Sequence, residues 1–191
     1  DNNNSSRTLW LAASAMLITQ MIMVAIMTMT PIHMKLHGHS LAAIGLVISI
    51  HIAAMYLPSP LTGLLVDRIG YRRVLAGAGL TLLAAGVLAA FSPAGSIPLL
   101  AVALGLLGLG WNFGLIAGTA AVTHAAPINV RASTQGSVDM TVSLAGAAGG
   151  LGSGFVVAGS SFAILGLAGG LLGLAILPLI LFNRPLIRAN P

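Results

Sequence analysis

The densest cluster of charge in the sequence is the range 63–74, which holds four of the eleven formally charged residues. Long apolar segments flank this range on both sides. A short polar turn that joins two membrane-spanning helices has this pattern. We refer to the range as the charged segment; its glycines and charged residues are Gly63, Asp67, Arg68, Gly70, Arg72 and Arg73.

A few polar side chains lie inside the apolar segments, where each is costly in lipid and is expected to face a cavity or a partner helix. Trp111 offers an apolar face and one N–H donor, whereas Gln20 and Asn112 offer donors and acceptors. This neutral set suits contact with an uncharged or amphipathic solute; hydrogen bonding between helices is the alternative. His51 lies at similar depth and can relay a proton, although a buried structural histidine is favoured. Tyr56 could contribute to an adaptable apolar wall, although contact with lipid or packing is favoured.

Composition decides what surrounds the protein. Of the 191 residues, 57% are hydrophobic and 6% are charged, and the mean hydropathy is +1.01. Such a chain cannot cover a surface exposed to water, so its exterior must face the lipid bilayer. The apolar runs have no alternation of polar and apolar positions, which excludes a membrane β-barrel. The sequence therefore predicts an all-α integral membrane protein.

The residue types present in the chain argue against several other classes of function. The net charge of +5 comes from basic residues at the ends of apolar runs rather than from a basic face, so no nucleic-acid partner is expected. The chain has no cysteine, which excludes disulfides, zinc–thiolate sites and thiol catalysis. The glycine-rich stretches are expected to allow close helix packing and lack the lysine of a nucleotide-binding loop, so no cofactor is expected.

Six membrane spans are predicted, each of roughly 20 residues. Pro31 is expected to end the first span, and Pro58 and Pro60 to kink the second. The range 123–134 is expected to be a polar connection. The domain boundaries follow as a linker at 1–7, a membrane domain at 8–183 and a tail at 184–191. The spans are expected at about Leu9–Thr30, Leu41–Leu64, Val74–Phe91, Ile97–Val122, Gln135–Val157 and Phe162–Phe182.

The distribution of basic residues predicts the orientation. With both termini in the cytoplasm, seven arginines lie on the cytoplasmic side and only Lys35 lies outside. Asp139 is the only acidic residue within a span, about one turn from its cytoplasmic end, so an ion pair with the arginines of the charged segment is favoured over a proton carrier. Asp67 is expected to pair with Arg131 or to lie at a helix amino-terminus.

The charged segment resembles the loop signature of the major facilitator superfamily of transporters, Gly-x-x-x-Asp-Arg-x-Gly-Arg-Arg-Arg in outline. Tyr71 departs from it at one basic position. The resemblance implies two six-helix halves, each made of two inverted three-helix repeats, of which this chain contains one. An arginine in the fourth span and a proline in the fifth, which occur in first halves, are absent. The ranges 108–113 and 131–136 and the linker-like start also favour the second half.

The resemblance implies half of a secondary active transporter that moves a small solute or drug-like compound by alternating access in the inner membrane. Its partners would be the other six-helix half, the solute and the bilayer. Ion pairs of Asp67 and Asp139 would then hold the cytoplasmic side closed.

Two alternatives of other kinds remain. A six-helix carrier or channel could work as a homodimer. An intramembrane serine protease would use Ser153 with a histidine, but His124 is expected at the opposite membrane face. Three histidines outside the membrane, at positions 33, 37 and 39, lack an accompanying carboxylate, so a flexible loop is favoured over a metal site.

Overall fold

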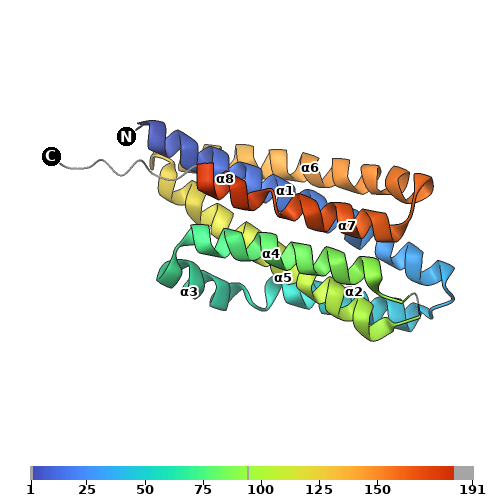
Figure 1. Ribbon diagram of the computed structural model, residues 1–191. Coiled ribbons are helices and arrows are strands. Elements are labelled where there is room, and N and C mark those ends of the chain that lie inside the picture. Colours follow the sequence, from blue (N-terminus) through green and yellow to red (C-terminus); the bar gives the residue numbers. More distant parts are fainter. Residues whose placement is uncertain (1, 94, 183–191) are drawn as a thin grey trace.

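The computed structural model describes residues 2–93 and 95–182, which form eight α-helices joined by short connections (Figure 1). Six segments are long and apolar enough to cross a membrane, because α2 with α3 and α7 with α8 each form one interrupted span. The predicted six-span, all-α architecture is confirmed. The helices are α1 (Asn2–Leu36), α2 (Leu41–Tyr56), α3 (Ser59–Ile69), α4 (Tyr71–Phe91), α5 (Ile97–Ala125), α6 (Arg131–Gly159), α7 (Phe162–Gly173) and α8 (Ile176–Phe182).

Four spans form a row, and α4 and α7 pack over one side of it. In the row, α6 packs against α1, α1 against α5, and α5 against α2 and α3. α4 and α7 pack against each other and cover one side of the row, α4 on α5 and α7 on α1 (Figure 1). We call the other side of the row, formed by α6, α1, α5 and α2 with α3, the open face.

The connections alternate between the two ends of the bundle. The beginning of α1, the junction of α3 with α4, the connection of α5 to α6 and the end of α8 lie at the same end (Figure 1). These are the segments that carry the arginines at positions 7, 68, 72, 73 and 131. The fold thus gathers at one end the segments predicted to face the cytoplasm.

The first helix continues through Pro31, so the prediction that this proline ends the span is wrong. Helices in apolar surroundings tolerate proline where neighbouring groups satisfy the freed carbonyls. The turn after the helix is made at Gly38, whose φ of 79° is a conformation that glycine adopts without a steric penalty. The His39 amide donates to the Met34 carbonyl at 3.1 Å, as in a Schellman motif.

The charged segment is almost entirely helical, which corrects the prediction of a polar turn. Gly70 is the single residue between α3 and α4. Its φ of 87° lies in the left-handed region that favours glycine, and its amide donates to the Val66 carbonyl at 2.8 Å. One glycine therefore replaces the expected loop.

Two spans are interrupted. The predicted kink near Pro58 and Pro60 is confirmed, since Leu57 and Pro58 separate α2 from α3. The second interruption, at positions 174–175 between α7 and α8, was not predicted. The expected polar connection at 123–134 shortens to 126–130 because the helices on both sides are longer than predicted.

Glycines bring α4 and α7 into close contact. A Cβ atom at Gly79 would lie 2.8 Å from the Gly173 carbonyl oxygen, and one at Gly86 would lie 2.8 Å from the Gly170 Cα. The predicted packing role is thereby confirmed for this crossing. It does not extend to the whole of α6, where a Cβ at Gly152 would have no described atom within 4 Å outside its own chain neighbours and helix backbone.

We expect the Gly86→Ala substitution to destabilise the fold by about 1–3 kcal/mol, since the new methyl group meets the backbone of α7, which cannot move aside. Thermal unfolding in detergent measures the effect. Gly152→Ala is the matched control, and equal melting temperatures for the two variants would contradict the packing role of Gly86.

Candidate functional site

Asn112 lies in the middle of α5 and is only 1% exposed. Its Nδ2 donates to the carbonyl oxygen of Met55 at 2.8 Å and to Ser59 Oγ at 2.8 Å. Its Oδ1 accepts a hydrogen bond from Thr62 Oγ1 at 2.5 Å. The side chain predicted to contact solute therefore connects three residues around the α2–α3 interruption and is enclosed by protein.

The sequence around the interruption removes two backbone donors. Pro58 and Pro60 have no backbone N–H, so neither can donate to the carbonyl four residues earlier. In the membrane such carbonyls have no water to bind and need partners within the protein. The carbonyls four residues before the two prolines are those of Ala54 and Tyr56. Asn112 donates to the carbonyl between them, that of Met55, and accepts from Thr62. Asn112 was predicted from the sequence, whereas Ser59 and Thr62 were not; the nearby prolines were the available signal for them.

Trp111 is the preceding residue of α5 and turns toward the open face. Its Nε1 donates to Gln20 Oε1 of α1 at 2.6 Å. On the other side, the Tyr56 ring meets the indole edge to face, with centroids 5.7 Å apart. Trp111 is 8% exposed, whereas Tyr56, the last residue of α2, is 59% exposed.

Gln20, Trp111 and Tyr56 therefore form one cluster across α1, α5 and α2, which we call the aromatic cluster. Gln20 also packs against α6, where a Cβ at Gly146 would lie 2.9 Å from its Nε2. Two of the predicted cavity residues are thus brought together, and the structure adds Tyr56. From the sequence, lipid contact or packing is favoured for Tyr56 over a place in an adaptable apolar wall.

His51 is fully buried between α2 and α5, away from the open face. Its Nδ1 lies 2.8 Å from the Leu104 carbonyl oxygen, which can only accept, so Nδ1 carries the proton. Its Nε2 has no hydrogen-bond partner among the described residues. In this conformation His51 connects two helices and is separated from the exposed part of the aromatic cluster.

The charged segment lies at the end of the bundle where α3 meets α4. Asp67 and Arg68 are exposed near the end of α3, and Gly63 is inside this helix. Arg73 Nη1 donates to the Ile69 carbonyl at 3.4 Å. Arg72 Nε donates to the Tyr71 hydroxyl at 3.5 Å.

The predicted partners of the charged segment make local contacts on α6. Asp139 is exposed, and its Oδ1 accepts a hydrogen bond from Gln135 Nε2 at 2.7 Å. Arg131 Nη2 donates to the Ala126 carbonyl at 3.4 Å, while its Nε is buried without a partner among the described residues. The contacts found for Asp139 and Arg131 in this conformation are therefore local ones and not the expected ion pairs.

The other chemical candidates do not form sites. Ser153 is 2% exposed and donates to the Gly150 carbonyl at 2.7 Å, in the half of α6 opposite to the end at which His124 closes α5. Within the described part of the chain no group of three or more metal-ligating side chains is present. The His33 ring instead stacks on Phe162, with centroids 4.4 Å apart.

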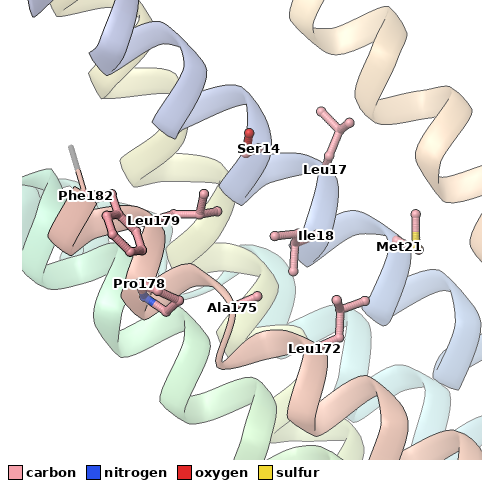
Figure 2. Close-up of a pocket in the computed structure, with 9 residues that line it drawn as sticks. All are labelled: Ser14, Leu17, Ile18, Met21, Leu172, Ala175, Pro178, Leu179 and Phe182. Carbon is pink, nitrogen blue, oxygen red and sulfur yellow. The ribbon is translucent and has the colours of Figure 1, made fainter.

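A groove of about 600 Å³ lies between α1 and the α7–α8 interruption (Figure 2). Figure 2 shows Ser14 as the one hydroxyl-bearing side chain among otherwise apolar ones. The groove contains none of the predicted site residues, so its size alone does not make it the functional site. Its lining is Ser14, Leu17, Ile18, Met21, Leu172, Ala175, Pro178, Leu179 and Phe182.

Comparison with known proteins gives consistent matches. Residues 9–191 match the model of the Major Facilitator Superfamily. The chain is 53% identical over 184 residues to the uncharacterized MFS-type transporter YdeG of Bacillus subtilis, covering 96% of this chain and 43% of the relative. It is 58% identical over 146 residues to the uncharacterized MFS-type transporter YddS of the same organism, covering 76% and 34%.

A third relative has a named solute. The riboflavin transporter RfnT of Brucella anthropi is 37% identical over 129 residues, covering 68% of this chain and 32% of the relative. The matched regions span less than half the length of all three of these relatives.

Fluorescence can test the hydrogen bond between Trp111 and Gln20, because the only other tryptophan, Trp10, can be replaced by phenylalanine. In that background, Gln20→Leu removes the acceptor of the indole N–H. We expect the Trp111 emission to shift to shorter wavelength by several nanometres. Gln135→Leu, far from the cluster, is the control, and an unchanged spectrum in Gln20→Leu would disprove the contact.

Proposed function

The chain belongs to the major facilitator superfamily of membrane transporters, and from this premise we propose that it forms one six-helix half of a secondary active transporter. We infer that it is the second half, with the open face turned toward the first. The two halves together would enclose a central cavity and move a small solute by alternating access. The membrane would be the inner membrane, with both termini in the cytoplasm.

The aromatic cluster is the observation that supports this proposal most directly. Trp111 lies on the open face of α5, while Val102, nine positions earlier and 54% exposed, lies on the opposite side of the same helix. Polar side chains in mid-membrane are retained where they face a cavity or a partner. Gln20 and Trp111 fit this rule on the open face, whereas Val102 belongs to an entirely apolar groove between α2 and α5.

The composition of the cluster favours a solute with an uncharged planar ring. Tyr56 presents an exposed aromatic ring and a hydroxyl, and neither it, Trp111 nor Gln20 carries a charge at neutral pH. Aromatic rings attract other rings in stacked or edge-to-face geometry. RfnT, the relative with a named solute, is a riboflavin transporter, which makes riboflavin a reasonable first probe.

We expect Tyr56→Ala to raise the KM for a transported aromatic solute roughly fivefold, the effect of losing a ring contact of about 1 kcal/mol. The measurement is uptake or release of labelled solute, riboflavin first, by vesicles that contain this chain together with the other half.

Val102→Ala is the matched control, because it shortens an exposed side chain on the other side of α5. Equal KM values in Tyr56→Ala and Val102→Ala, for a solute that is transported, would contradict the proposed site. Transport by vesicles that contain this chain alone would instead favour the homodimeric carrier.

We propose in addition that Asp67, Arg131 and Asp139 form the cytoplasmic gate in another conformer of the cycle. Asp67 and Asp139 are exposed, and the contact found for Arg131 among the described residues is a 3.4 Å hydrogen bond to a carbonyl oxygen. These groups are therefore available for new ion pairs when the two halves close over this end. A contact made in one conformer alone shifts the population toward that conformer.

Accordingly, Asp67→Arg is expected to lower the transport rate several-fold while leaving the amount of folded protein unchanged, because the reversed charge repels the arginines of the closed gate. Initial rates in vesicles and size-exclusion profiles measure the two quantities. Lys35→Glu, a charge reversal beyond the other end of the bundle, is the control. Normal transport by Asp67→Arg would exclude this gate.

A further inference from the structure

α3 is weakly held by apolar packing. Thr62 is the only buried residue among the eleven residues of this helix. Four of its apolar side chains, at positions 61, 64, 65 and 69, are exposed. Helices with few buried apolar contacts open or move at low free-energy cost. The position of α3 must therefore depend strongly on its few specific contacts.

The strongest of these contacts converge on Asn112. Thr62, the buried residue of α3, donates to Asn112 Oδ1 at 2.5 Å, and Ser59 Oγ in the first turn of α3 accepts from Nδ2 at 2.8 Å. The same Nδ2 also binds the carbonyl of Met55 in α2 at 2.8 Å. One side chain of α5 thus fixes α3 relative to α2, across the interruption that separates them.

Both ends of α3 are points at which the backbone can change direction. At one end, Pro58 and Pro60 cannot donate the helical hydrogen bonds that would make α2 and α3 continuous. At the other end, Gly70 alone connects α3 to α4, in a left-handed conformation with φ 87°. Between these points, α3 is a rigid rod about 16 Å long.

We propose that α3 is a hinged segment, that the interruption at Leu57–Pro58 is its hinge, and that Asn112 is the positioning residue that holds it in the orientation seen here. A rotation of about 10° about the hinge would move the far end of the rod by about 3 Å. That end carries Asp67 and Arg68, so the hinge sets where the charged segment lies.

The arrangement also connects the hinge to the aromatic cluster, a link that rests on the proposed transport function. Tyr56 is the last residue before the hinge, and Trp111 is the neighbour of Asn112 along α5. Displacement of the Tyr56 ring by a solute acts on the backbone next to the Met55 carbonyl that Asn112 binds. Occupation of the cluster and the position of the charged segment are thereby coupled through contiguous residues.

Spin labels can test the hinge, because the chain has no native cysteine that would compete with introduced ones. One cysteine pair at Leu64 and Val102 reports on α3 against α5. A second pair at Leu46 and Val102 reports on α2 against α5, on the near side of the hinge. All three positions are exposed. Distance distributions are measured by pulsed electron paramagnetic resonance on the whole chain in lipid nanodiscs.

The decisive variant is Thr62→Val, which keeps the shape of the side chain and removes only the hydroxyl that binds Asn112. We expect it, like Asn112→Ala, to broaden the Leu64–Val102 distribution or to shift it by about 2 Å, the movement of Leu64 in a rotation of about 10°, and to leave the Leu46–Val102 distribution unchanged. Asn129→Ala, at an exposed position between α5 and α6, is the control and should change neither distribution.

Unchanged distributions for both pairs in Thr62→Val would overturn the hinge, as would equal changes in both pairs, which would mean general loosening. Because the measurement needs neither solute nor the other half, a failure of the proposed transport function would leave its result valid. Conversely, an active transporter with an immobile α3 would refute the hinge alone.

Discussion

Backbone and polar side-chain groups within a membrane find no water, so the protein itself must satisfy them. This constraint is most acute where two prolines interrupt the span of α2 and α3. Asn112 of the neighbouring helix binds this stretch, with both polar atoms of its amide bound and 1% of its surface exposed. His51 and close helix packing also hold α2 against α5. The position of α3, and with it that of its charged end, depends mainly on the Asn112 amide.

The sides of α5 border different environments. Asn112 and the side that meets α4 are enclosed, Trp111 reaches the open face with its N–H bound to Gln20, and Val102 faces an apolar groove on the opposite side. A polar side chain within the membrane is costly unless it has a partner. A few such side chains are therefore enough to distinguish the sides of α5. The placement of the aromatic cluster on the open face follows from this cost.

Much of the fold could be predicted from the sequence, since apolar runs of sufficient length specify spans and glycines specify close crossings. Local errors arose where one residue decides the backbone. Pro31 was predicted to end a helix that continues, and Gly70 replaces a whole predicted turn. For the site, sequence position gave the depth of Gln20, Trp111 and Asn112. Sequence position could not give the direction of a side chain, which separates Trp111 on the open face from Asn112 inside. It also could not show that Tyr56 meets Trp111.

The most direct test of the account asks whether the open face borders water or lipid. Tyr56 and Val102 are both exposed, on opposite sides of the α2–α5 pair, and single cysteines can replace them in this chain, which has no native cysteine. The same assembly without an introduced cysteine gives the background rate. The measurement is the rate of modification by a charged thiol reagent, with the chain assembled with the other half in vesicles. We expect Tyr56→Cys to react at least tenfold faster than Val102→Cys, because thiolates form in water and not in lipid. Equal protection of both positions would show that the open face borders lipid and would contradict the account.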